Sequence, residues 1–269
     1  MRLADALRRA RDRGDPIVAP YLMVDRGRRA TFAATVDALR QGGATALELG
    51  FPFSDPIADG PILETAHADA LDHGTRWSDL LEATRTASRS LPVAVMTYAN
   101  PIVRRGIEPA LAGLSEAGAT GLIVPDLSLE ESPPYRAAAR RHGLSLVLLA
   151  APGVGPDRVR RIARASSGFL YLVGHYGTTG GASRGARVDL RPIVRAARAA
   201  APGLPVLVGF GVKDPSSARR ALASGADGVI VGTALEERLR RRENPVGLAH
   251  WVQAIARASR SRSRPNGSR

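Results

Sequence analysis

The sequence predicts one (β/α)8 TIM barrel with an extra N-terminal helix that closes its bottom. With 269 residues, 44% of them hydrophobic, the chain is long enough to bury one large core. Eight short runs rich in Val, Ile and Leu alternate with segments of helical apolar spacing, and eight such units in roughly 250 residues are typical of this barrel. The runs are nearly continuous in apolar residues, which indicates parallel strands covered on both faces.

The elements follow one another in a regular order after a charged segment of helical spacing, MRLADALRRARDRGDP. The predicted strands are residues 17–24, 45–49, 93–98, 120–126, 145–150, 169–173, 205–210 and 228–232. The predicted helices between them include residues 30–43, 61–71, 107–118, 156–167 and 189–200, several of which end at a glycine suited to a C-cap. A doubly wound open sheet is the alternative, but its G-x-G-x-x-G fingerprint is absent after the first strand.

The domain organisation is simple. We expect residues 1–258 to form the barrel and residues 259–269 to form a basic, disordered tail, because RASRSRSRPNGSR combines repeated charge with few apolar residues.

The amino-acid composition excludes several classes of protein. The absence of cysteine excludes disulfides and thiolate metal sites, and no apolar run has the length of a signal peptide core or a membrane span, so we expect a cytoplasmic protein without a membrane partner. The net charge of +13 raises the question of nucleic acid. Arginines recur on almost every predicted helix and aromatics are only 4%, which favours solvated helix faces over a nucleic-acid partner.

Glu48 is the first candidate catalytic residue. It lies near the end of the second predicted strand, between Leu47 and Leu49, and chemistry in this fold gathers where strands end. Burial raises the pKa of such a carboxyl toward the range of a general acid or base. The alternative is a structural ion pair between Glu48 and an arginine.

Two aspartates follow in the next loop. Asp59 precedes Gly60 and Pro61, where a more polar setting favours its ionised form, and two carboxyls in unlike settings can divide acid and base roles. The alternative for Asp59 is an N-cap of the following helix. Asp55 can equally hold its own loop through an Asx turn.

Glycine-rich loops predict a phosphate site. TTGG (178–181), GFG (209–211) and GTA (232–234) follow the last three strands, where backbone N–H groups can bind a dianion. Tight turns are the alternative for any single glycine. The five histidines, His67, His73, His142, His175 and His250, show no ligand-like pairing, so we expect no metal site.

The segment LELGFPFSDPIADGP (47–61) resembles the active-site segment of the tryptophan synthase alpha chain family. Further segments resemble that family in the same order: MTYANPI (96–102), GLIVPDLSLEES (121–132), FLYLV (169–173) before GTTGG (177–181), VGFGV (208–212) and ADGVIVGTAL (226–235). The resemblance implies a (β/α)8 barrel that cleaves indole-3-glycerol phosphate to indole and glyceraldehyde 3-phosphate without metal or organic cofactor. It also implies a beta chain as partner, in a heterotetramer that passes the indole on.

The resemblance assigns a role to each matching position. Glu48 is implied as the principal acid and base, Asp59 as the residue that stabilises the indole N–H, and Tyr171 as a residue lining the site near Glu48. The implied substrate-binding residues are Tyr98 and Ile123 around the indole, and Thr179, Gly180, Gly211, Gly232 and Thr233 around the phosphate.

The chain departs from the family's pattern in loops. MVDRGRRAT (23–31) replaces a Gly-Asp-Pro loop, Ser128 stands where proline is common, Gly174 to Tyr176 replace a serine-containing start, and Thr233 replaces a serine. Because Glu48 and Asp59 are kept, the hypothesis is a competent lyase. The alternatives are a stand-alone indole producer for another pathway, a non-catalytic activating partner of a beta chain, and a sugar-phosphate isomerase with the same phosphate loops.

Overall fold

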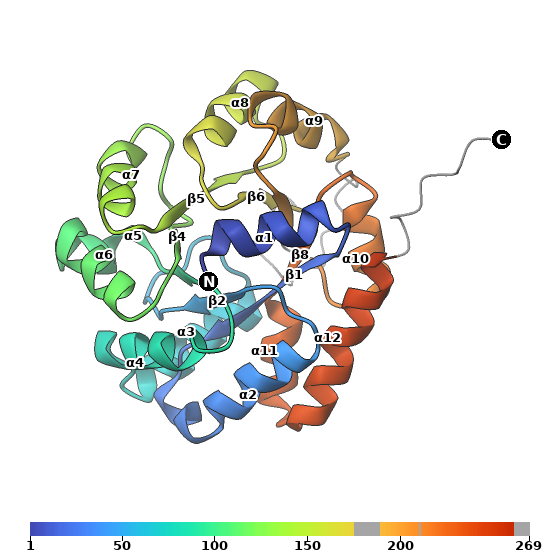
Figure 1. The fold of residues 1–269 in the computed structure, drawn as a ribbon. Coiled ribbons are helices and arrows are strands. Elements are labelled where there is room, and N and C mark those ends of the chain that lie inside the picture. The colour runs from blue at the N-terminus through green and yellow to red at the C-terminus, as the bar shows by residue number, and fades with distance from the viewer. Residues whose placement is uncertain (175–188, 210, 261–269) are drawn as a thin grey trace.

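Eight parallel strands form a closed barrel, in the order in which they follow one another along the chain (Figure 1). The computed structural model describes residues 1–174, 189–209 and 211–260. The strands are β1 (Ile17–Met23), β2 (Leu47–Gly50), β3 (Val93–Met96), β4 (Gly121–Ile123), β5 (Ser145–Ala150), β6 (Leu170–Val173), β7 (Val206–Gly209) and β8 (Gly228–Val231). Each observed strand begins and ends within three residues of a predicted run. The predicted TIM barrel is confirmed.

Helices surround the barrel and connect successive strands (Figure 1). The helices are α1 (Leu3–Asp12), η1 (Arg26–Arg28), α2 (Arg29–Gln41), α3 (Pro61–Asp72), α4 (Trp77–Ala87), α5 (Ala99–Val103), α6 (Ile107–Glu116), α7 (Ser132–Arg141), α8 (Pro156–Ala165), α9 (Arg191–Ala200), α10 (Pro215–Leu222), α11 (Thr233–Arg240) and α12 (Pro245–Arg260). Gly43 and Gly118 have φ values of 95° and 96° just beyond α2 and α6, where glycine ends a helix at low cost.

Each strand divides its side chains between two hydrophobic clusters, because successive residues point to opposite faces. In β2, Leu47 and Leu49 belong to the cluster between strands and helices, whereas Ala46, just before β2, belongs to the cluster inside the barrel. Glu48 therefore points into the barrel. In the strand register it lies between Tyr21 of β1 and Ala94 of β3, so it shares one layer of the interior with them.

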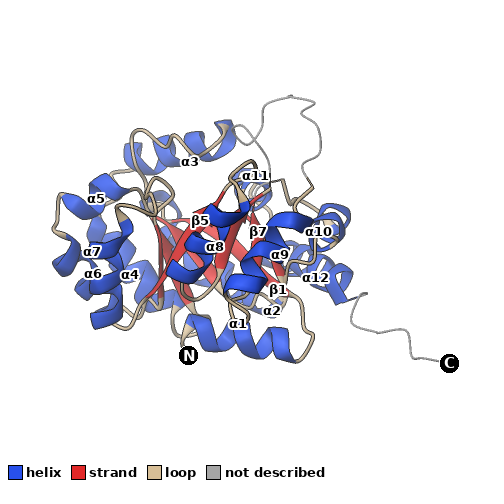
Figure 2. Cartoon of the chain, turned by 90° about the horizontal axis from the view of Figure 1, so that it is seen from above, coloured by secondary structure: helices blue, strands red, loops and turns tan. Residues whose placement is uncertain are grey.

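The two ends of the barrel differ. Helix α1 lies across one end, where Leu3 and Leu7 are buried in the interior cluster, which confirms the expected closing helix (Figures 1 and 2). Helix α3 lies at the opposite end, beyond the carboxyl ends of the strands (Figure 2). This leaves the carboxyl end for chemistry, as in other barrels of this kind.

Two predicted strands end two or more residues earlier than expected. The fourth run, 120–126, ends as a strand at Ile123, because Pro125 lacks the N–H that would continue the ladder. The third run, 93–98, ends at Met96, because α5 begins at Ala99. At the other end of the chain α12 continues to Arg260, past the predicted start of the tail, and residues 261–269 lie outside the described residues.

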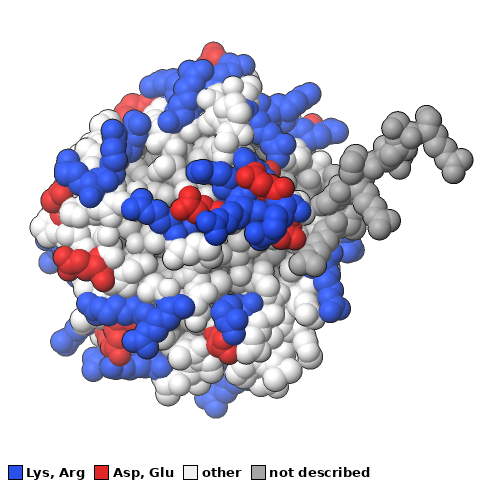
Figure 3. Space-filling model, viewed as in Figure 1, with Lys and Arg blue, Asp and Glu red and all other residues white. Residues whose placement is uncertain are grey.

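Basic side chains are spread over the surface. Figure 3 shows Lys and Arg in several groups over the α1 face, many of them beside Asp or Glu. Arg141 with Glu108 and Arg158 with Glu130 are examples of exposed pairs, at 2.5 and 2.8 Å. Among the described residues, no helix is long and apolar enough to cross a membrane.

Candidate active site

Glu48 is a buried acid without a hydrogen-bond partner in the described part of the chain. Glu48 is only 1% exposed. Neither of its carboxyl oxygens has a hydrogen-bond partner among the described residues. No arginine of the described residues pairs with Glu48, so the alternative of a structural ion pair has no support within this part of the chain. Burial raises the pKa of Glu48 well above its ordinary value, because the charged form loses its solvation without compensation. A raised pKa favours the protonated form, which is suited to giving a proton to a substrate.

Asp59 is equally buried but well partnered. The hydroxyl of Tyr98 donates to Asp59 Oδ2 at 2.8 Å, and Tyr98 Oη in turn accepts the N–H of Ala58 at 3.1 Å. Burial and then the Asp59 charge raise the pKa of Tyr98, so its hydroxyl remains a donor. The alternative that Asp59 caps α3 is wrong, because Gly60 is the N-cap and no side chain caps that helix.

His67 also contacts Asp59. Its Nε2 lies 3.1 Å from Asp59 Oδ2, and its Nδ1 lies 3.0 Å from the backbone N of Phe53. No motif in the sequence points to a role for His67, since the spacing of the histidines indicates only that they do not form a metal site. The local signal is its position on α3, the helix that begins two residues after Asp59. Among the described residues no cluster of His, Asp and Glu could hold a metal.

Two tyrosines occupy the interior beside the acids. The electrostatic influence of both Glu48 and Asp59 reaches Tyr171 and Tyr21, and burial is the main reason that the pKa of each phenol is raised. A Cβ on Gly209 would lie 2.2 Å from Tyr171 Oη, and a Cβ on Gly50 would lie 2.0 Å from Tyr21 Oη. Each tyrosine therefore extends over a glycine of the neighbouring strand. Tyr171 is placed near Glu48 as expected, whereas Tyr21 is a neighbour of the acids that the sequence does not reveal.

A small cavity joins Asp59 to the predicted phosphate residues. Its volume is about 30 Å³, and its lining includes Asp59, Tyr171, Gly211, Gly232 and Thr233. Tyr21, Leu63, Met96, Val212 and Ile230 complete the lining. Pockets that bind small molecules have volumes of about 300 Å³ or more, so this cavity, as far as it is described, is too small for an indole ring.

Several predicted site residues do not line this cavity. Glu48, Tyr98 and Ile123 are absent from the described lining of that cavity. Ile123 is fully buried at the end of β4 and belongs to the interior cluster. Thr179 and Gly180 lie outside the described residues. Asp55 is exposed and accepts a hydrogen bond from the hydroxyl of Ser54 at 2.5 Å.

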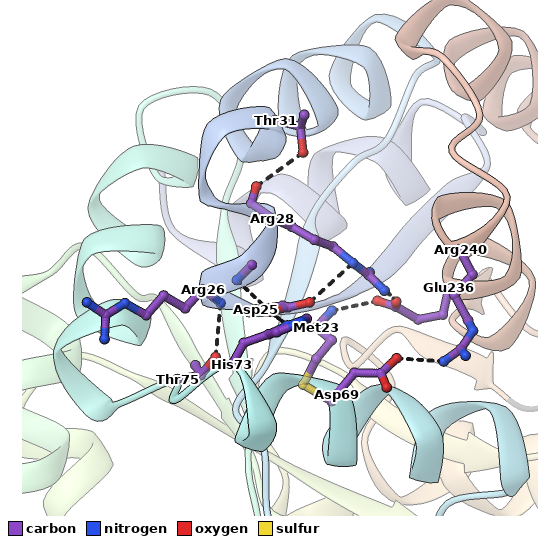
Figure 4. Close-up of polar contacts among 11 residues, drawn as sticks. Met23, Asp25, Arg26, Arg28, Thr31, Asp69, His73, Thr75, Glu236 and Arg240 are labelled. Carbon is purple, nitrogen blue, oxygen red and sulfur yellow. Dashed lines mark hydrogen bonds and ion pairs between the residues drawn. The ribbon is translucent and has the colours of Figure 1, made fainter.

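The loop after β1 is held by a buried polar network (Figure 4). Glu236 of α11, which is 0% exposed, accepts the N–H of Met23 at 2.8 Å and a hydrogen bond from Arg28 at 2.5 Å. Arg28 also reaches Asp25 at 3.4 Å, and Asp25 contacts His73, the C-cap residue of α3, at 2.7 Å. The loop that carries arginines in place of Gly-Asp-Pro is thus tied to the two helices that flank the cavity.

Comparison with known proteins agrees with these features. The sequence profile described as tryptophan synthase alpha chain matches residues 7–259. The chain belongs to the tryptophan synthase alpha chain family.

Relatives in this family align over most of their length. The tryptophan synthase alpha chain of Synechocystis is 40% identical over 232 residues, which cover 85% of this chain and 87% of the relative. That of Arabidopsis thaliana is 36% identical over 245 residues, covering 90% and 88%. A solved structure of tryptophan synthase from Mycobacterium tuberculosis is 34% identical and has a TM-score of 0.85, covering 96% of this chain and 98% of that one.

Proposed function

We propose that this chain cleaves indole-3-glycerol phosphate to indole and glyceraldehyde 3-phosphate, as a carbon-carbon lyase of tryptophan biosynthesis. The observation that carries the proposal is the pair of buried acids in a family member: Glu48 without a partner and Asp59 held by hydrogen bonds. The two environments are unlike, as acid and base chemistry on one substrate requires.

Protonated Glu48 suits the first step. It gives its proton to indole C3, which turns the ring into an indolenine whose N–H bears positive charge. The carboxylate of Asp59 stabilises that N–H, so the ring becomes an electron sink. Both groups act in a water-poor interior, where a fixed charge acts strongly on charge that develops in the ring.

The second step breaks the carbon-carbon bond. Ionised Glu48 takes the proton of the glycerol hydroxyl next to C3, and the oxygen electrons form the aldehyde. The electrons of the broken bond return to the ring and restore neutral indole, while Glu48 is again protonated. These steps use only the side chains of the protein, so the proposal includes no metal or organic cofactor.

The phosphate is assigned to the residues after β7 and β8. Gly211 has a φ of 78°, and Gly232 is the N-cap of α11, whose first residue is Thr233. All three line the cavity that holds Asp59. N–H groups at the start of a helix bind anions, and the Thr233 hydroxyl adds a donor. Thr179 and Gly180 are proposed to complete this site, and Tyr98, Ile123 and Tyr171 to surround the indole.

A beta chain is the proposed partner, in a heterotetramer in the cytoplasm. Two apolar side chains at the carboxyl end of the barrel support a docking surface there: Ile57 is 76% exposed and Val103 is 58% exposed. Exposed apolar side chains beside a site are typical of an interface. Indole release by the chain alone would support the stand-alone alternative, in which the product serves another pathway.

The test is indole release from indole-3-glycerol phosphate by the purified chain, alone and with a beta chain. Asp59→Asn keeps the shape of the side chain but removes its charge, so kcat should fall about 10²- to 10³-fold. Asp55→Asn is the matched control in the same loop, because Asp55 is exposed, and the chain alone should keep its activity.

Each negative result has a distinct meaning. No indole from the wild-type chain under either condition would contradict the lyase and favour a non-catalytic activating partner. Equal loss in Asp59→Asn and Asp55→Asn would show that the loop, and not the Asp59 charge, determines activity.

A further inference from the structure

His67 is a buried imidazole that the two catalytic steps do not use. It lies on α3, is 3% exposed, and bridges Asp59 to the backbone of the loop before it. Its two ring nitrogens are both occupied, one by the Phe53 N–H and the other by the Asp59 carboxylate.

The hydrogen bonds fix the protonation of the ring. A backbone N–H can only donate, so Nδ1 of His67 must offer its lone pair to Phe53. The ring proton therefore sits on Nε2 and is donated to Asp59 Oδ2. His67 is held as a neutral imidazole in one tautomer, in the way that a hydrogen bond to one ring nitrogen sets the state of the other.

The same logic applies to the second donor on Asp59. Tyr98 Oη accepts the N–H of Ala58, so its own proton is free to point at Asp59 Oδ2. Two neutral donors, each oriented by a backbone N–H, thus converge on one carboxylate oxygen. An arginine would neutralise the carboxylate, whereas these two neutral donors hold it in place and leave it charged. Both donors bind Oδ2, so neither of them occupies Oδ1.

We propose that His67 is a positioning residue: as the neutral Nε2–H tautomer it holds the Asp59 carboxylate so that Oδ1 is presented to the N–H of the indole ring. This inference rests on the proposed function. Catalysis by Asp59 depends on where its free oxygen stands when the ring becomes positive, and a shift of about 1 Å can cost about a hundredfold in rate.

Two substitutions separate the two hydrogen bonds. In His67→Gln, the side-chain amide nitrogen can take the place of Nε2 and donate to Asp59. In His67→Asn, the shorter side chain can replace Nδ1 as acceptor for Phe53 but falls short of Asp59. Each variant therefore keeps one bond of the original pair and loses the other.

The expected result is an asymmetry in kcat. His67→Gln should keep kcat within about threefold of the wild type, whereas His67→Asn should lose about 10- to 100-fold, with a smaller change in KM. Thermal unfolding of both variants checks that folded proteins are compared. A merely structural role predicts similar losses in both variants, and that result would overturn the proposal.

A second readout does not depend on activity. In NMR spectra of ¹⁵N-labelled protein, the imidazole signals that disappear in His67→Gln are assigned to His67. The ¹⁵N shifts of the two ring nitrogens should then show a proton on Nε2 and none on Nδ1 at neutral pH. A proton on Nδ1, or on both nitrogens, would overturn the proposal. If the wild-type chain released no indole, the proposed function would fail, and this spectrum would still decide how His67 holds Asp59.

Discussion

Glu48 and Glu236 are two glutamates with the same burial and opposite surroundings. They are 1% and 0% exposed, yet Glu236 accepts hydrogen bonds from Met23 and Arg28, whereas Glu48 has no partner in the described part of the chain. Burying a carboxylate is costly unless it is paired. The partnered glutamate therefore stabilises the fold, whereas burial raises the pKa of the unpartnered one, which is the property that the proposed proton transfer uses.

The same contrast holds within the site. Asp59, in the loop between β2 and α3, is almost as buried as Glu48 but has donors from Tyr98 and His67. Its charge is supported before the substrate arrives, while the charge of Glu48 is not. Burial alone therefore does not separate these acids, and the number of donors around each one is what distinguishes the roles proposed for them.

Glu48→Gln should produce the largest effect on activity. The amide is similar in shape but cannot deliver or accept the proton, so kcat for indole release should fall about 10²- to 10⁴-fold. The free energy of unfolding at neutral pH should stay the same or rise, because a neutral amide replaces an acid that burial disfavours when it is charged. A variant that lost stability as well as activity would contradict the contrast with Glu236.

Glu236→Ala should produce the reverse pattern. Removing the carboxylate leaves the Met23 N–H and the Arg28 guanidinium without their acceptor, which should lower the free energy of unfolding by about 1 to 3 kcal/mol. The cost is limited because Arg28 keeps Asp25 as a neighbour. Urea unfolding measures the loss, and kcat should change far less than in Glu48→Gln.

The matched control for Glu236 is the next residue on α11. Glu237→Ala removes a carboxyl from the same helix without touching the buried network, so it should leave stability within about 0.5 kcal/mol of the wild type. Similar losses in both variants would mean that the helix, and not the network, responds to the change.

The pH dependence of stability should also distinguish Glu48, and its sign follows from burial. The pKa of Glu48 is raised above its value of 4.5 in the unfolded chain, so between the two values the native state binds more protons. The free energy of unfolding therefore falls as pH rises through that window, by about 1.4 kcal/mol for each unit of the difference. Glu48→Gln should lack this fall. Parallel pH curves for the two proteins would contradict the assignment.

The sequence predicts the fold well because the signals are local. Runs of Val, Ile and Leu indicate the strands. Leu47 and Leu49 lie on the outer face of β2, so Glu48 between them points into the barrel. Its lack of partners is not local, since it depends on which side chains from other strands surround it. The sequence alone leaves the ion-pair alternative open for that reason.

The interactions that the sequence does not predict join residues that are far apart in the chain or depend on backbone groups. Glu236 and Arg28 are separated by 208 positions, and no local pattern joins them. His67 lies closer to Asp59, but its role depends on the backbone N–H of Phe53. The N-cap alternative for Asp59 fails by one residue, because Gly60 takes that position before Pro61.

The two tyrosines that extend over Gly50 and Gly209 have a consequence for protein engineering. Because a Cβ at either glycine would fall within 2.0 to 2.2 Å of a phenol oxygen, neither position can be randomised alone. A library that seeks room for a bulkier indole analogue would have to vary residues 21 and 50, or 171 and 209, as linked pairs. Shrinking a tyrosine would then permit a side chain on the opposing strand, and the new shape of the chamber would be set by the pair.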